Sequence, residues 1–236
     1  MPVRRPPNRS TESVDNYLKA ILTLGERQPG RVASNALAAH LGVAPASVTN
    51  MLQKLAAATV PLVEYERHRG VLLSSSGRRR ALEIVRHHRL IETFLYEILD
   101  YPIEELHEEA ERLEHFISER FEERIAAKLG HPKFDPHGHC IPALDGAMPS
   151  HHSIPLTEAA SAKDEADRRT FTVESISDRD AVTLRLLSTS GITPGVHLHL
   201  NGRHADDGYT VTVGNSAKSM HLSHQAASAI RISLPD

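Results

Sequence analysis

The stretch His107-Glu-Glu-Ala-Glu-Arg-Leu-Glu-His115 places two histidines and four glutamates within nine residues. Apolar residues recur through it at helical spacing, which predicts one helix over residues 104–129. At about 100° per residue, four of these side chains share an arc roughly 100° wide: His107, Glu111, Glu114 and His115. Imidazole nitrogen and carboxylate oxygen are donors that divalent first-row metals accept. The arc is therefore a candidate metal site, and the alternative is an ordinary solvated face of a glutamate-rich helix.

Length and composition are those of an ordinary folded protein with two or three small domains: 236 residues, 40% hydrophobic and 24% charged. No apolar run approaches the roughly 20 residues that cross a bilayer. The basic N-terminus has no apolar run behind it, so we expect neither a membrane span nor a secretory signal. A single cysteine, Cys140, leaves no intrachain disulfide and favours a cytoplasmic location.

The charge is divided unevenly along the chain. Residues 1–80 carry 12 basic and 5 acidic side chains, a balance of +7, whereas residues 81–130 carry 6 and 13, a balance of −7. A basic first third suits a polyanion, and an acidic middle suits cations.

Residues 33–55 have the pattern of a helix-turn-helix. Residues 33–41 predict a short helix that Gly42 ends, and Pro45 suits the first turn of the next helix. Val48, Leu52 and Leu55 would form its buried stripe. The outward side chains can bind base edges and phosphates: Ser47, Thr49, Asn50, Gln53 and Lys54.

The next segment predicts a two-stranded wing. Residues 62–66 and 71–73 flank Arg67-His-Arg-Gly70, so the tip is basic, and Arg67 and Arg69 are candidate DNA contacts. A small helical domain with a hairpin is the alternative. It does not explain the basic tip, the +7 balance and the polar helix face together. We therefore predict a winged helix-turn-helix DNA-binding domain over residues 1–75.

A second long helix is predicted from Ser76 to about Leu99. Its apolar stripe includes His88 and Glu92, and burying both without partners is costly. Because Tyr101-Pro102 breaks the helix, residues 76–142 should form an antiparallel hairpin in which this pair faces the 107–115 set. That arrangement favours a metal site over an ordinary solvated helix face.

The remainder predicts a breaker-rich loop, a linker and a β domain. Residues 131–142 contain five potential ligands in a loop that either coordinates a metal or forms a plain turn: His131, Asp135, His137, His139 and Cys140. Residues 143–169 have the composition of a linker. Alternating apolar runs across residues 170–236, with one helix at residues 179–187, predict a small β-barrel.

This order of parts resembles the diphtheria-toxin-repressor family of dimeric, metal-activated transcription regulators. The resemblance is tightest in residues 45–55, 65–70, 88–92 and 107–115. It implies a mainly α fold with small β parts (α+β): the winged helix-turn-helix, a helical dimerisation and metal-binding hairpin, and a C-terminal SH3-like barrel. It also implies a homodimer that binds a palindromic double-stranded operator and represses metal-uptake genes.

The resemblance implies two metal sites. The primary ligands match His88, Glu111, Glu114 and His115, with one position on the first helix that aligns with Asn16. Asparagine brings an oxygen but no charge, and neighbouring Asp15 could substitute. The iron-responsive branch has cysteine where this chain has Glu111, and a hard oxygen there favours Mn²⁺. The ancillary ligands match Glu92, Asp135 and His137, with a barrel carboxylate that aligns with Asp180.

The expected mechanism is activation by Mn²⁺. Without metal the carboxylates of the cluster would repel one another and leave the first helix loosely placed; metal would tie that helix to the hairpin. One rival is a winged-helix regulator that responds to Fe²⁺, Zn²⁺ or a small molecule. The other is a dimetal-carboxylate enzyme, which usually needs two Glu-x-x-His helices. Only Glu104 and His107 fit that spacing, so we expect no enzyme.

Overall fold

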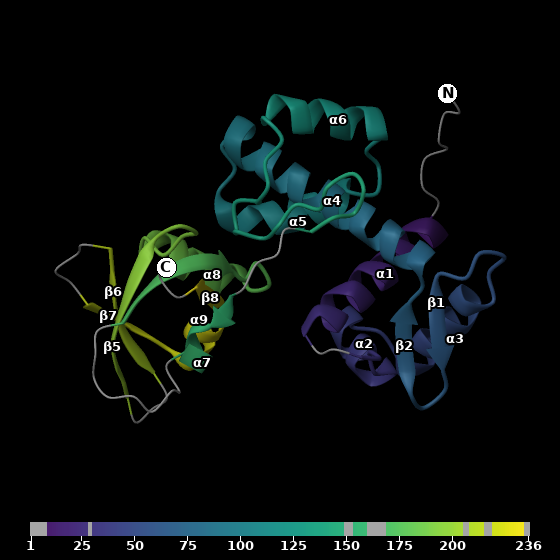
Figure 1. The fold of residues 1–236 in the computed structure, drawn as a ribbon, viewed down its shortest axis with the longest axis horizontal. Helices are drawn as coiled ribbons and strands as arrows, with labels where there is room; N and C mark the ends of the chain where they lie inside the picture. The colour runs from purple at the N-terminus through teal and green to yellow at the C-terminus, as the bar shows by residue number, and fades with distance from the viewer. Residues whose placement is uncertain are drawn as a thin grey trace. The chain divides into compact units, whose positions relative to one another are not determined.

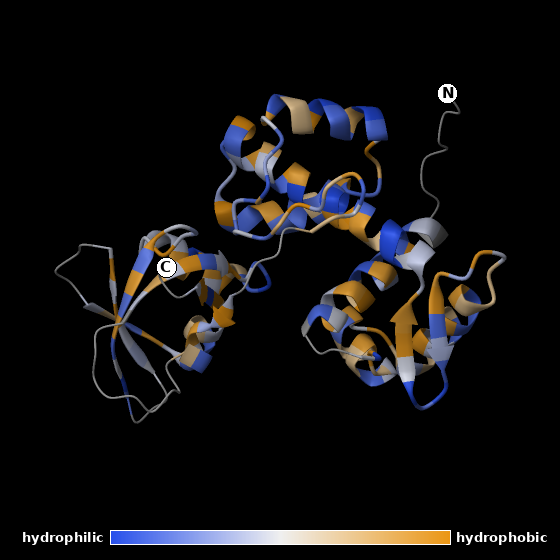
Figure 2. Cartoon of the chain, in the orientation of Figure 1, coloured by the Kyte–Doolittle hydropathy of each residue, from blue (hydrophilic) through white to orange (hydrophobic). Residues whose placement is uncertain are grey.

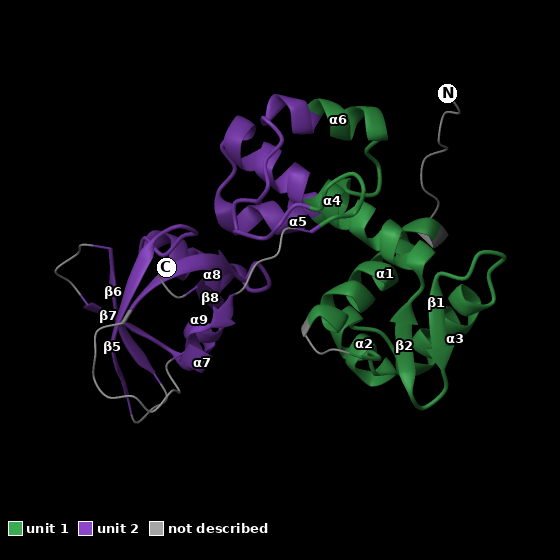
Figure 3. Cartoon of the chain, in the orientation of Figure 1, with its two compact units in different colours: residues 1–88, 111–124, 142–147 green, residues 89–110, 125–141, 148–236 purple. Residues whose placement is uncertain are grey.

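The computed structural model describes residues 9–27, 30–148, 153–159, 169–204, 208–214 and 219–233 (Figure 1). The chain divides into two compact units (Figure 3): unit 1 contains residues 1–88, 111–124 and 142–147, and unit 2 contains residues 89–110, 125–141 and 148–236. Within the described ranges, no helix is both long and apolar enough to cross a membrane.

Unit 1 begins with the predicted winged helix-turn-helix. Its elements are α1 (Arg9–Arg27), α2 (Ser34–Leu41), α3 (Pro45–Ala56), β1 (Val63–Glu66) and β2 (Gly70–Leu73). Gly42 ends α2 with a left-handed φ of 65°, and its N–H donates to the Ala38 carbonyl. Helix α1 continues through Gly25 and ends at Arg27.

The predicted stripe of α3 is buried, since Val48, Leu52 and Leu55 are each at most 3% exposed. Strands β1 and β2 pair antiparallel, and Val32 extends their ladder through backbone hydrogen bonds with Val71. Figure 2 shows a hydrophilic turn between β1 and β2, which is the predicted basic tip. Burial of one α3 face leaves the opposite face available for a ligand.

The hairpin differs from the prediction in one respect. Helix α4 (Ser75–Leu99) is as expected, but the single helix predicted over residues 104–129 is wrong. The segment forms a 3-10 turn, η1 (Ile103–Glu105), then α5 (Leu106–Leu113) and α6 (Glu119–Lys128). Ser118 interrupts it, because its backbone carbonyl and hydroxyl accept hydrogen bonds from the first turn of α6.

Unit 2 contains a six-stranded antiparallel sheet in the order β3-β8-β4-β5-β6-β7. The strands are β3 (Ile154–Pro155), β4 (Arg169–Ile176), β5 (His197–Arg203), β6 (Tyr209–Val213), β7 (Ser219–Leu222) and β8 (Ile230–Ser233). Short helices accompany them: α7 (Leu156–Ala159), α8 (Ala181–Thr189) and α9 (His224–Ser228). The expected fold class is confirmed. Residues 154–159, placed in the predicted linker, form β3 and α7, whereas residues 149–152 and 160–168 lie outside the described ranges.

Two apolar clusters support unit 2. Phe171, Val173 and Leu198 are fully buried within the sheet core. Leu90 of α4 packs with buried residues of α6 and the 131–141 loop. The loop is also attached to β4, since the Ile176 N–H donates to the His137 carbonyl at 2.9 Å. These contacts position the loop that bears the predicted ancillary ligands.

Candidate metal centres

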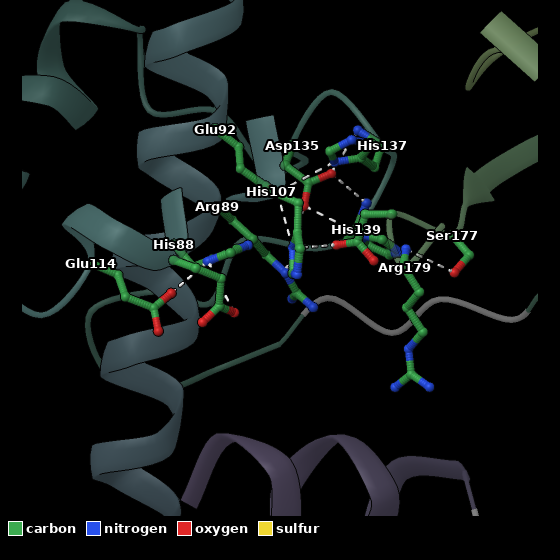
Figure 4. Close-up of polar contacts among 12 residues, drawn as sticks. His88, Arg89, Glu92, His107, Glu114, Asp135, His137, His139, Ser177 and Arg179 are labelled. Carbon is green, nitrogen blue, oxygen red and sulfur yellow. Dashed lines mark hydrogen bonds and ion pairs between the residues drawn. The ribbon is translucent and has the colours of Figure 1, made fainter. Parts of the chain in front are cut away.

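The first cluster of donors lies in unit 1, where three elements converge. His88 comes from α4, Glu111 from α5, and Glu114 from the turn after α5. Each offers a ligand atom within 4.8 Å of the others. Glu114 is the most enclosed, with no solvent exposure, and its Oε2 lies 2.5 Å from His88 Nδ1 (Figure 4).

His115 connects this cluster to the first helix. Its Nε2 lies 3.4 Å from Glu114 Oε1 and 2.8 Å from Asn16 Oδ1. Asp15 faces the other ring nitrogen at 3.7 Å, but its carboxylate accepts a 2.6 Å hydrogen bond from Arg80. Asn16 therefore offers its oxygen to the cluster, while Asp15 is held by an arginine. The structure brings together all five primary positions that the resemblance implied.

Lys19 also enters this cluster, which the sequence analysis did not anticipate. Its ammonium donates to both Glu114 oxygens, at 2.9 and 2.8 Å, and to Glu111 Oε1. Burial opposes the charge of this side chain, but Glu114 and Glu111 outweigh burial and raise the pKa of Lys19. Burial likewise opposes ionisation of Glu114, yet hydrogen bonds and charge from His88 and Lys19 hold its pKa below the ordinary value.

A neighbouring ion-pair network supports the turn that carries Glu114. His87 contacts the Glu114 carbonyl through Nδ1 at 3.2 Å and Glu122 Oε2 through Nε2 at 2.9 Å. Arg86 donates to the same carboxylate and to the Pro142 carbonyl. Burial opposes ionisation of Glu122, but its hydrogen bonds from His87 and Arg86 lower its pKa. His87 thus positions the turn rather than facing the cluster.

Glu122→Gln should destabilise the metal-free protein by about 1–3 kcal/mol at pH 7, because a buried hydrogen-bonded charge is lost. The native pKa of Glu122 is lowered, so its contribution is present above the ordinary glutamate pKa of about 4.3 and disappears as pH falls. Urea unfolding of both proteins at pH 7 and pH 4 should show the difference shrink. Glu123→Gln, an exposed neighbour, should change the free energy of unfolding by less than about 0.5 kcal/mol; a pH-independent Glu122→Gln effect would contradict the prediction.

The second cluster lies entirely in unit 2. Glu92 from α4, His107 from α5 and Asp178 after β4 each offer an atom within 4.8 Å of the others. His107 Nδ1 is 3.9 Å from Glu92 Oε1 and 3.3 Å from Asp178 Oδ2. Burial opposes ionisation of Asp178, but the hydrogen bond and charge of His107 hold its pKa well below the ordinary value. His107 therefore joins Glu92 and Asp178, whereas the predicted arc placed it with Glu111.

The 131–141 loop supplies Asp135, His137 and His139 to the same region (Figure 4). Asp135 Oδ1 accepts hydrogen bonds from the backbone N–H groups of His137 and His139, each at 2.9 Å. Its Oδ2 is buried, accepts no hydrogen bond from the described residues, and lies 3.6 Å from Arg89 Nε. One oxygen thus orders the loop while the other faces the cluster.

His137 is oriented so that one nitrogen faces the cluster. Its Nε2 contacts the Ile103 carbonyl at 3.2 Å, and because a carbonyl only accepts, Nε2 carries the proton there. Nδ1 is buried and 3.6 Å from Glu92 Oε1. Burial lowers the pKa of His137, but Glu92, Asp135 and Asp178 outweigh it and raise the pKa to about 9. The buried carboxylates that favour a proton on His137 would also favour a divalent cation in place of the Nδ1 proton.

The barrel carboxylate in this cluster is Asp178, two residues before the aligned Asp180. Asp180 caps α8: its side chain accepts from the Val182 N–H and the Thr183 hydroxyl, and from Gln225. The sequence itself indicated this capping role, since an Asp before an apolar helical run is a typical N-cap. Cys140 is buried, and its backbone carbonyl accepts a hydrogen bond from Arg89.

The predicted DNA-contact residues are mostly exposed in unit 1. Ser47, Asn50, Gln53 and Lys54 lie on the outer face of α3, and Arg67 on the wing tip. The Thr49 hydroxyl donates within the helix to the Pro45 carbonyl at 3.1 Å, and Arg69 pairs with Glu66 at 2.7 Å.

Comparison with known proteins identifies the DNA-binding domain and the helical domain that follows it. Two family models for iron-dependent repressors match this chain. The model of the N-terminal DNA-binding domain matches residues 10–71, and the model of the metal-binding and dimerisation domain matches residues 74–143. The HTH-type transcriptional regulator MntR of Oceanobacillus iheyensis is 34% identical over 125 residues, which cover 53% of this chain and 82% of that protein. The chain belongs to the diphtheria-toxin-repressor family. It is therefore a metal-dependent, DNA-binding transcriptional repressor with a dimerisation domain, and not an enzyme.

Other family members match over nearly the whole length. The iron-dependent repressor IdeR of Mycobacterium leprae is 26% identical over 232 residues, 95% of this chain and 98% of that protein. A solved manganese-dependent transcriptional repressor in complex with manganese is 39% identical, with a TM-score of 0.83, covering 94% of this chain and 100% of that chain. The family thus includes relatives named for iron and relatives named for manganese.

Three residues of the clusters were missed or left undecided by sequence reasoning. Lys19 had a usable signal, because it lies three residues after Asn16 on one helix and so shares its face. His139 was among the loop candidates, but spacing alone did not select it. Asp178 had no local signal, because its role depends on where β4 brings the chain.

Proposed function

We propose that this repressor is activated by Mn²⁺ bound at the unit 1 cluster. The ligands would be His88, Glu111, Glu114 and His115, with the Asn16 side-chain oxygen as a further donor. The observation that carries the proposal is the convergence of these donors around Glu114, which is fully buried. The donors are oxygen and imidazole nitrogen, with no thiolate, which favours Mn²⁺ over metals that seek sulfur. The manganese-containing relative gives further support.

A bound divalent ion would supply positive charge among these carboxylates. Contacts among the chain's own residues determine which elements this charge would hold together. Asn16 and His115 connect α1 to the turn after α5, and His88 connects that turn to α4. Because α1 packs against α2 in the same unit, tightening these connections would bias the position of the helix-turn-helix. The carboxylates therefore serve as the sensor and α1 as the transmitting element.

We propose a second site for the same class of cation, formed by Glu92, His107, Asp135, His137 and Asp178. Support comes from burial of Asp135 Oδ2 and His137 Nδ1 facing the cluster. Because these donors join the loop and β4 to the hairpin within unit 2, occupancy would stabilise this unit.

We infer that the target is a palindromic operator in the cytoplasm, bound by a homodimer. Two copies of α3 would enter successive major grooves about 34 Å apart, one DNA turn. The exposed polar face of α3 and the basic wing tip support this arrangement.

The function is tested by fluorescence anisotropy on duplex DNA from the region upstream of the protein's own gene, at fixed salt. We expect Mn²⁺ to tighten binding by at least about tenfold over metal-free protein, the size of a typical allosteric coupling. Fe²⁺ under anaerobic conditions and Zn²⁺ are the comparison metals. Asn50→Ala with Gln53→Ala should weaken DNA binding about tenfold or more while leaving Mn²⁺ affinity unchanged, since each base contact contributes about 1–3 kcal/mol.

Equal DNA affinity in all metal conditions would contradict activation. Stronger tightening by Fe²⁺ than by Mn²⁺ would instead assign the protein to the iron-responsive regulators, as the resemblance to IdeR allows.

A further inference from the structure

The Lys19 ammonium lies among the donors of the unit 1 cluster rather than beside them. It is 2.8 and 2.9 Å from the two oxygens of Glu114, hydrogen-bonded to Glu111, and 3.4 Å from His88 Nδ1. Glu114, Glu111 and His88 are the three residues of this cluster whose ligand atoms lie within 4.8 Å of one another. The Lys19 side chain is only 18% exposed, so the ammonium is held inside the cluster.

We propose that Lys19 is a tethered cation that occupies the primary site in the metal-free protein and must leave before a metal ion binds there. The proposal rests on the proposed function of this cluster. Both Glu114 oxygens and the Glu111 Oε1 are engaged by the ammonium, so a metal ion that uses these atoms competes with it directly. Two cations at contact distance in a partly buried site also repel strongly.

Lys19 alters the expected behaviour of the metal-free state. The sequence predicted that Glu111 and Glu114 would repel one another and leave α1 loose. Instead, a cation from α1 pairs with both carboxylates and connects α1 to the hairpin elements of unit 1. Metal binding is then an exchange of one positive charge for two, and the lysine raises the metal concentration at which that exchange occurs.

The test is Lys19→Met, which keeps the length of the side chain and removes its charge. We expect Mn²⁺ to bind at least about tenfold more tightly by isothermal titration calorimetry, because the competing charge is gone. The metal-free variant should melt at lower temperature, and Mn²⁺ should raise that temperature more than in the wild type. Lys128→Met is the matched control: it removes an equal charge from an exposed position at the end of α6 and should leave Mn²⁺ affinity unchanged.

Unchanged or weaker Mn²⁺ binding by Lys19→Met would overturn the proposal. Glu114→Gln separates this failure from failure of the proposed function. If Glu114→Gln weakens Mn²⁺ binding while Lys19→Met has no effect, the cluster binds metal and only the role of Lys19 is wrong. If neither variant changes Mn²⁺ affinity, the cluster is not the metal site.

A second readout uses the wild-type protein and does not depend on the folding of any variant. Amine acetylation followed by mass spectrometry should modify Lys19 slowly in metal-free protein, where its nitrogen is bound by carboxylates. Saturating Mn²⁺ should increase the Lys19 rate several-fold, with exposed Lys54 as the internal reference. A Lys19 rate that Mn²⁺ leaves unchanged or lowers would show that the ammonium is not displaced.

Discussion

Glu114→Gln is expected to weaken Mn²⁺ binding at the primary cluster by about 100-fold or more and to abolish metal-dependent DNA binding. Glu114 has no solvent exposure, and both its oxygens face other members of the cluster. The amide keeps the shape of the side chain but removes the negative charge and one acceptor. Loss of groups that merely orient a ligand already costs about 10–100-fold in affinity, and Glu114 is proposed as a ligand itself.

The measurements are calorimetric titration with Mn²⁺ and anisotropy on the operator duplex with and without Mn²⁺. Glu108→Gln is the matched control, because it makes the same change at an exposed position of α5. It should retain both properties. Wild-type DNA affinity of Glu114→Gln at micromolar Mn²⁺ would contradict the assignment of the sensor to this cluster.

Gly138→Ala is expected to disrupt the second cluster and to lower the free energy of unfolding by about 2–4 kcal/mol. Gly138 has a left-handed φ of +86°, and a Cβ there would lie 2.0 Å from the Glu174 carbonyl oxygen. Because that oxygen belongs to the backbone of β4, no side-chain rotation relieves the overlap. The loop must move away from β4, which separates Asp135 and His137 from Asp178.

The matched control is Gly130→Ala, where φ is +72° but no atom lies within 4 Å of the added Cβ. It should cost about 1 kcal/mol, the strain of the left-handed conformation alone. Urea unfolding of both variants, with a count of bound Mn²⁺ per chain, separates strain from overlap. Equal destabilisation of the two variants, or full retention of the second ion by Gly138→Ala, would show that the loop tolerates the change.

Local patterns in the sequence were sufficient to predict the DNA-binding domain. The stripe of Val48, Leu52 and Leu55 follows from helical periodicity, and Gly42 and Pro45 mark the turn between the helices. The resemblance then led to His88, Glu111, Glu114, His115 and Asn16, which the structure brings together. Their proximity could be anticipated because it depends on spacing along one helix and on the known order of a family's parts, whereas their binding of a metal stays a prediction.

Only the tertiary structure decided which donors share a cluster. Helix α5 ends at Leu113, so Glu114 and His115 lie in a turn, where helical spacing no longer gives their directions. His107 instead meets Glu92 and Asp178 through the packing of unit 2. Lys19 reaches Glu111 and Glu114 across more than 90 residues of sequence. Periodicity reports the face on which a side chain lies, but its charge partners depend on which other element packs against that face.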